Sequence, residues 1–140
     1  MTITRIPPQA LQTENIQYLT SQNWVSGVNT YDYRQGPVFY HSNTPTASWT
    51  VDIVNAPTLY LNGQANAYNN YGGLVVEFKV CATLSTTVYY PNQLRIEGAG
   101  QTLFVQSGTG TASRFNIWTF QLFRVGTTWV KSCLKTHEAY

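Results

Sequence analysis

The chain has few side chains of the types that usually hold a metal ion. It contains two histidines, His41 and His137, and two cysteines, Cys81 and Cys133. Neither histidine has a second histidine, cysteine or carboxylate at a ligand spacing, and the cysteines lack the CxxC spacing. We therefore predict no metal site and interpret the histidines as solvated side chains in a loop and in the tail. Pairing of the cysteines stays open, although a reducing cytoplasm favours two free thiols.

Carboxylates are the next candidates, because hydrolysis of a glycosidic bond requires two of them facing each other across a cleft. The sequence leaves open that Asp52 meets Glu77 or Glu97 in space. Their positions on the polar faces of alternating strands instead favour ordinary solvated side chains. The six carboxylates are spread singly through different segments: Glu14, Asp32, Asp52, Glu77, Glu97 and Glu138. We therefore predict no catalytic residues.

Glycine-containing segments also lack the features of a cofactor site. GAGQTL and SGTGTAS have neither the flanking lysine nor the opening helix of a phosphate-binding loop, and no GxSxG motif is present. These glycines are typical of turns. We predict no cofactor and no enzymatic activity.

Tyrosines offer a binding chemistry rather than a catalytic one. Tyr60, Tyr68 and Tyr71 surround an Asn-rich segment, and Tyr31, Tyr33 and Tyr40 lie in a turn-rich one. Such residues provide a large contact area at a small entropic cost, which suits either stacking on a sugar or contact with protein. We keep Tyr60, Tyr68 and Tyr71 as candidate glycan contacts, with contact between protein subunits as the more usual role.

The composition indicates what kind of partner the surface suits. Of the 140 residues only 10% are charged and 14% are aromatic, and the net charge is +2. The basic residues form no run that could follow a phosphate backbone, and no apolar run approaches the roughly 20 residues needed to cross a bilayer. The length corresponds to one domain, and we predict that the protein is soluble and binds neither nucleic acid nor membrane. Weakly charged surfaces of this kind suit permanent burial against other proteins.

Most of the chain has the pattern of β-strands. Residues 49–53 and 74–80 alternate apolar and polar side chains with a period of two, as half-buried strands do. Further short strands are expected near residues 87–90, 93–97 and 101–106, and a long loop is expected at 59–73. The spacing of these strands predicts an all-β fold, a β-sandwich of jelly-roll type.

The stretch FNIWTFQLFRVGTTWVKS, residues 115–132, predicts a hairpin whose first strand is apolar on both faces. Phe115, Ile117 and Phe123 lie on one face, and Trp118, Phe120 and Leu122 lie on the other. A strand of this kind is covered on both sides, either within a sandwich or between subunits. We therefore expect self-association, with a trimer favoured.

Residues 1–45 lack the regular alternation of residues 46–140, which we expect to form the β-sandwich domain. The segment ALQTENIQYL allows at most one helical turn, and residues 25–46 are expected to be loop with one short strand at 38–40. We interpret residues 1–45 as a docking arm followed by a turn-rich segment. The residues expected to dock onto a partner are Ile6, Pro7, Pro8, Leu11, Ile16 and Leu19.

Three stretches resemble a known family: TPTASWTVDIVNAPT, YYPNQLRIEGAGQTLFVQSGTGTASRFNIWTFQLFRV and GTTWVKSCL. Together they look like a small β domain of tail-fibre and structural virion proteins in tailed bacteriophages, notably cyanophages. The resemblance covers residues 44–134, but the segment SGTGTASRFN is shorter than its family counterpart. The positions that match the family pattern are Tyr90, Pro91, Ile96, Gly98, Gln101, Phe120, Leu122, Arg124, Trp129 and Val130.

The resemblance implies a structural role in a phage particle and brings no catalytic residues. We expect a tail-fibre or tail-appendage component, assembled in the host cytoplasm, that contacts other virion proteins at the tail or head surface. Two alternatives stay open: a capsid decoration protein, and a carbohydrate-binding module that recognises host surface glycans.

Overall fold

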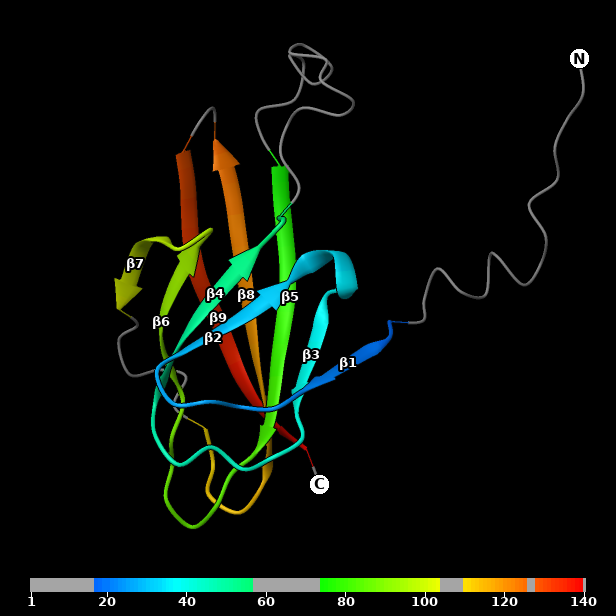
Figure 1. Cartoon of the computed structure of the whole chain (residues 1–140), viewed down its shortest axis with the longest axis vertical. Helices are drawn as coiled ribbons and strands as arrows, with labels where there is room; N and C mark the ends of the chain where they lie inside the picture. The colour runs from blue at the N-terminus through cyan, green and yellow to red at the C-terminus, as the bar shows by residue number, and fades with distance from the viewer. Residues whose placement is uncertain (1–16, 57–73, 104–109, 126–127, 140) are drawn as a thin grey trace, which may run out of the picture.

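The computed structural model describes residues 17–56, 74–103, 110–125 and 128–139, which form nine strands in two sheets packed face to face (Figure 1). The five-stranded sheet contains, in spatial order, β1 (Leu19–Gln22), β3 (Val38–His41), β5 (Leu74–Thr83), β8 (Phe115–Val125) and β9 (Thr128–Ala139). The four-stranded sheet contains β2 (Val28–Asp32), β4 (Trp49–Val54), β6 (Pro91–Ile96) and β7 (Ala99–Leu103). The described residues include one 3₁₀ turn, η1 (Tyr33–Gln35), and no α-helix. The predicted all-β sandwich is confirmed.

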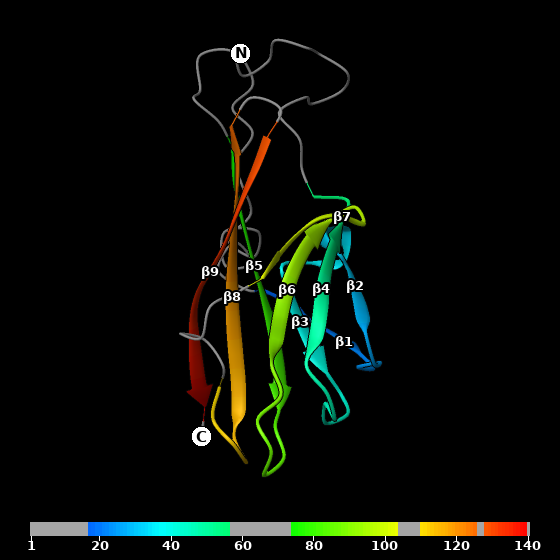
Figure 2. The same ribbon diagram turned by 90° about the vertical axis from the view of Figure 1, so that its left-hand side faces the viewer.

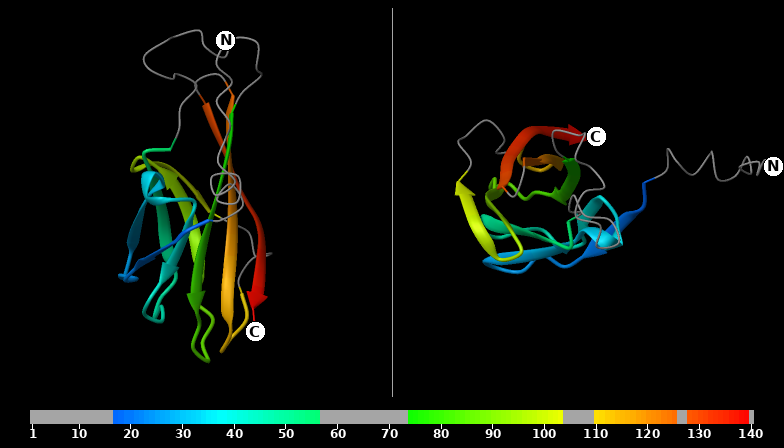
Figure 3. Two further views of the ribbon diagram at one scale, coloured as in Figure 1. Left: turned by 90° about the vertical axis from the view of Figure 1, so that its right-hand side faces the viewer. Right: turned by 90° about the horizontal axis from the view of Figure 1, so that it is seen from above.

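From β1 to β6 the chain crosses to the opposite sheet after every strand. All pairs among these six strands are parallel: β1 with β3, β3 with β5, β2 with β4, and β4 with β6. Each pair of crossings therefore adds one coil of a two-layered solenoid, and the view from above in Figure 3 shows the two layers. Jelly rolls are built from antiparallel Greek keys, so the jelly-roll-like pairing that we expected is wrong. Side chains alternate with the same period in parallel and antiparallel sheets, so the sequence pattern did not distinguish them.

The C-terminal strands leave this solenoid path. β8 pairs antiparallel with β5, and β9 pairs antiparallel with β8, which confirms the expected hairpin. β5, β8 and β9 are the longest strands, and at one end they extend beyond the four-stranded sheet (Figure 2). Among the described residues, no strand of the four-stranded sheet lies opposite that projecting end.

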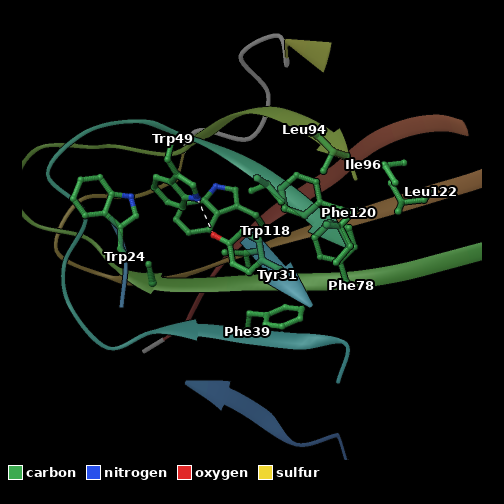
Figure 4. Packing of buried hydrophobic residues seen from close by; sticks show 14 of the residues in the cluster. Trp24, Tyr31, Phe39, Trp49, Phe78, Leu94, Ile96, Trp118, Phe120 and Leu122 are labelled. Atoms are coloured by element: carbon green, nitrogen blue, oxygen red, sulfur yellow. Dashed lines mark hydrogen bonds between the residues drawn. The ribbon is translucent and has the colours of Figure 1, made fainter. Parts of the chain in front are cut away.

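The core lies between the sheets and is rich in aromatic side chains (Figure 4). On β4 the alternating residues Trp49, Val51 and Ile53 are buried against the opposite sheet, as the period of two predicted. The rings of Trp49 and Trp118 meet edge to face with centroids 5.5 Å apart, and the rings of Phe78 and Phe120 stack at 4.9 Å. The first contact joins the two layers, and the second joins neighbouring strands of the five-stranded sheet.

Residues 19–41 form three strands. The short strand expected at 38–40 is confirmed by β3, whereas β1 and β2 form where we expected an arm and a loop. β1 and β3 join the five-stranded sheet and β2 joins the four-stranded sheet. They pair with β4 and β5, which lie beyond the expected boundary at residue 46, so this part of the chain belongs to the same sandwich. Long-range pairing has overridden the local turn signal of Asn29, whereas Gly27 keeps a φ of 92° in the bend before β2. The Asn29 side chain bonds both the N–H and the carbonyl of Val25 while Asn29 itself lies in β2.

Candidate assembly surface

Three apolar side chains form a row across the projecting end of the five-stranded sheet. Val75 on β5 pairs with Phe123 on β8, and Phe123 pairs with Val130 on β9. Paired residues point to the same side of a sheet, so all three lie on its outer face. Val75 is 56% exposed and Val130 is 52% exposed, and Val125, two residues beyond Phe123, is also exposed. We call Val75, Phe123, Val125 and Val130 the tip patch.

The tip patch arises because β8 is apolar on both faces. Trp118, Phe120 and Leu122 point inward and are completely buried, whereas Phe123 on the opposite face is only half-buried. The two apolar faces that we predicted for this strand are therefore present. A single chain covers only one of them.

A band of polar side chains borders the tip patch on the same outer face. Lys79 Nζ donates to Glu77 Oε1 at 3.0 Å, and Gln121 Nε2 donates to Glu77 Oε2 at 3.1 Å. These hydrogen bonds hold the pKa of the Glu77 carboxyl below its usual range. The band separates the tip patch from the ring of Tyr40, which packs 5.8 Å from that of Phe115. The apolar area of the outer face is thus divided into two parts.

Cys81 lies on the outer side of β5 but is buried. Burial raises the pKa of its thiol to about 11, so the thiol stays neutral near pH 7. Cys81 is unpaired, as expected for a free thiol. The side chain of Cys133 lies outside the described residues.

The inner side of the projecting end carries a cation over an aromatic ring. The guanidinium carbon of Arg124 lies 5.1 Å from the centre of the Trp129 ring. The two residues face each other across the β8–β9 pair. This contact stiffens the hairpin that presents the tip patch.

The outer face of the four-stranded sheet is polar. Asp52 on β4 lies 3.3 Å from Arg95 Nε on β6 and accepts the Gly98 N–H at 2.9 Å. On the neighbouring rung Thr50 donates to Gln93 at 3.1 Å. These polar and charged side chains contact one another within the sheet, in contrast to the apolar tip patch.

The carboxylates considered for glycosidic chemistry are held apart or engaged locally. Asp52 and Glu77 lie on the outer faces of opposite sheets, so they do not face a common cleft. Glu97 accepts the Asn55 N–H at 2.5 Å in the turn after β6. Asp32 binds Arg34 with an Nη2–Oδ2 distance of 2.7 Å, which holds the pKa of the Asp32 carboxyl far below its usual value.

A buried polar cluster lies where we expected a solvated loop histidine. His41 ends β3, is 1% exposed, and its Nε2 lies 2.7 Å from the Tyr31 hydroxyl oxygen. The Trp49 indole N–H donates to the same oxygen at 3.0 Å, a bond drawn in Figure 4. Burial lowers the pKa of His41 to about 4 and raises the pKa of Tyr31. The solvated-loop interpretation of His41 is therefore wrong, because its partner comes from the facing sheet.

Of the docking residues that we predicted, the structure describes one. Leu19 is the first residue of β1 and is 53% exposed. The other docking candidates lie outside the described residues: Ile6, Pro7, Pro8, Leu11 and Ile16. The candidate glycan contacts Tyr60, Tyr68 and Tyr71 also lie outside them. By contrast, Tyr31 from the turn-rich segment is a fully buried core residue.

A second group of exposed apolar residues includes Leu19, which we predicted as a docking residue, and three residues that the sequence did not single out. Large apolar side chains that are exposed in the described part of the chain gather at the tip patch and along the β1–β2 segment. The group in the β1–β2 segment consists of Tyr18, Leu19, Val25 and Val28. Its only signal in the sequence is a run from residue 17 to 31 without a charged side chain.

No group of three potential metal ligands occurs among the described residues, and no helix found there is long and apolar enough to cross a membrane. Comparisons with models of protein families, with curated proteins and with solved structures find no match to this chain.

Proposed function

We propose that this protein is a structural component of a tailed-phage virion, a tail-fibre or tail-appendage part that acts by assembling with other protein subunits. The observation that carries the proposal is the tip patch, which lies on a projecting hairpin and is exposed in the single chain. Contiguous exposed apolar side chains of this kind mark sites of contact with other proteins.

Burying the tip patch against another subunit would contribute a modest free energy per residue. In an assembly of identical subunits this contribution is made once by every subunit. Full burial of a valine or phenylalanine side chain contributes about 1.5–3 kcal/mol relative to an exposed one. Val75 and Val130 are each a little over half exposed, so each has about 1 kcal/mol still to gain. A symmetric assembly would collect this gain in every subunit. The trimer expected from the sequence remains a prediction.

The residues that carry the family resemblance occupy positions that build the sandwich and its projecting hairpin. Pro91 begins β6, and Gly98 has a φ of 77° in the tight turn before β7. Phe120 is fully buried, while Arg124 and Trp129 contact each other. Arg124 and Trp129 flank the short turn of the pattern and face each other across the β8–β9 pair, so the pattern positions coincide with structural positions of the hairpin. This agreement is the support that they give to the resemblance and with it to the virion role.

A mass measurement tests the proposal with two matched variants. Val130→Asp places a charge in the tip patch, and Thr86→Asp places the same charge at an exposed position in the connection between β5 and β6. We expect light scattering after gel filtration to show an oligomer for the unmodified chain and for Thr86→Asp, and a smaller species for Val130→Asp. An unmodified chain that is monomeric at micromolar concentration would contradict the proposal.

The two alternatives differ in what the described residues say of them. The carbohydrate-binding role rests on Tyr60, Tyr68 and Tyr71, which lie outside the described residues, and capsid decoration would use the same kind of assembly surface. Both stay predictions, as does the absence of enzymatic activity.

A further inference from the structure

The sandwich has two lateral sides, each formed by one edge strand from each sheet, and these two sides differ. On one side β7 and β9 are the last strands of their sheets, and on the other side β1 and β2 are. At the β7–β9 side Lys131 on β9 donates from its ammonium group to the Gly100 carbonyl on β7. Both strands also pair with irregular register. Lysines and register shifts of this kind discourage a sheet edge from pairing with another chain.

The β1–β2 side has fewer of these devices. Residues 17–31 contain no charged side chain and no proline, and the one charged residue of the two strands is Asp32 at the end of β2. The pairings of β1 and β2 show no register shift. More than half of the exposed large apolar residues described lie here: Tyr18, Leu19, Val25 and Val28, against Val75, Val125 and Val130 elsewhere. We call the free sides of β1 and β2 the open edge.

Backbone groups of the open edge point away from the sandwich. The Gln22 carbonyl accepts from Ser42 N at 3.0 Å, on the side of β3. The N–H and C=O of one strand residue point to the same side, and successive residues alternate. Ser21, the preceding residue, therefore presents both groups to the open edge. By the same argument Thr30 on β2 does so, because the Gly27 carbonyl bonds Thr50 N on the side of β4 at 2.9 Å.

The interior at this side is already closed, so a partner is needed for the edge and not for the core. Thr20 donates to the Gln35 carbonyl at 2.7 Å. Gln22 Nε2 reaches the Thr30 carbonyl at 3.4 Å, a long bond that leaves the Thr30 N–H free to pair. These polar side chains seal the end of the core between the two sheets. Within the described residues, they leave two short strands whose Ser21 N–H and C=O and Thr30 N–H point to the open edge.

We infer that a second copy of this chain pairs with the open edge, β1 with β1 and β2 with β2. Packed sheets lie about 10 Å apart, so a partner must offer two strand edges at that separation. A copy related by a two-fold axis along the sheet normal does so and brings both strand pairs together antiparallel. Asp32 at the end of β2 is the one charged residue of the two strands. A pairing of β2 with its copy centred on Thr30 places Asp32 opposite Val28, so no like charges face each other. This contact is separate from the tip patch and does not depend on the proposed function.

Ser21→Pro tests the pairing with little disturbance to the chain's own sheet. Proline lacks the N–H, and the Ser21 N–H points to the open edge rather than to β3, so the β1–β3 hydrogen bonds remain. Ser21→Thr keeps the N–H and is the matched control. We expect Ser21→Pro to weaken association through this edge by about tenfold or more, with an unchanged melting temperature.

Combining this change with Val130→Asp separates the two contacts. We expect light scattering to show a dimer for Val130→Asp, an oligomer held by the tip patch for Ser21→Pro, and a monomer for the double variant. A monomeric Val130→Asp would overturn the open-edge inference. If Ser21→Pro alone were monomeric, the edge contact would stand and the tip-patch proposal would fail.

Two further measurements guard against a misfolded variant or a different occupant. Val28→Lys adds a charge on β2 at an exposed side chain and should reduce the dimer in the same way. Hydrogen exchange of the Ser21 and Thr30 amides in the full chain should slow as protein concentration rises. Protection that is already present at the lowest concentration would mean that the chain covers its own edge, which overturns pairing with a second copy.

Discussion

The two faces of β8 are similarly apolar but have different surroundings. Trp118, Phe120 and Leu122 are completely buried between the sheets of one chain, whereas Phe123 shares the outer face with Val75 and Val130, which are both more than half exposed. The inner face therefore contributes to the stability of the monomer, and the outer face can gain burial only from another molecule. Apolar composition indicates that a strand face will be covered, and the structure shows whether the chain itself covers it.

The largest difference in stability is expected when one phenylalanine on each face of β8 is replaced by alanine. Phe120→Ala should lower the free energy of unfolding by about 3–5 kcal/mol, because it leaves a cavity and removes the stack with Phe78. Phe123→Ala should lower it by less, because the Phe123 ring is only partly buried in the single chain and has no second sheet packed against it. Urea denaturation at low protein concentration measures both values. Equal losses would mean that the outer face is as well covered as the inner one.

Acid should lower the free energy of unfolding, because the buried His41 side chain resists protonation in the fold. The pKa of His41 is about 4 in the fold, and its ordinary value is 6.5, because burial disfavours the charged imidazolium. The unfolded chain therefore takes up the proton first, so this contribution to stability is fully present above pH 6.5 and is lost as the pH falls toward 4. The difference of 2.5 pH units corresponds to a loss of up to about 3 kcal/mol.

The pH effect is measured by urea denaturation at pH 7, 5.5 and 4. His41→Gln keeps a polar partner for the Tyr31 hydroxyl without a titrating group, so its stability should vary less over this range. Unmodified and variant proteins with the same pH dependence would show that His41 does not titrate as a buried neutral base.

A smaller effect is expected at the base of the tip patch. The Arg124–Trp129 contact at 5.1 Å should contribute about 0.5–1 kcal/mol, typical of a cation over an exposed aromatic ring. A double-mutant cycle with Arg124→Gln and Trp129→Leu isolates the coupling from the loss of each side chain. Additive single changes would show that the hairpin does not need this contact.

The sequence identified the strand faces better than the strand partners. The period of two placed Trp49, Val51 and Ile53 on one face of β4 and separated the two faces of β8, because alternation is a local property of a strand. The parallel coils of β1 to β6 depend instead on pairing between distant segments, and parallel and antiparallel strands have the same alternation. Fold class was therefore predictable and topology was not.

The missed features of the site are the ones that depend on long-range partners. β1 and β2 have few apolar inward residues, and Gly27 and Asn29 are typical of turns, so the segment resembled a loop. His41 is buried because the hydroxyl of Tyr31 reaches it from the facing sheet, a contact between elements whose pairing the sequence did not predict. Both features became visible only with the two sheets in place.

The most direct test of the whole account is the mass of the unmodified chain in solution over a range of concentrations, measured by sedimentation equilibrium. The account predicts a species larger than the monomer at micromolar concentration, which dissociates on dilution. A chain that stays monomeric throughout this range would contradict the idea that its exposed apolar strands serve assembly.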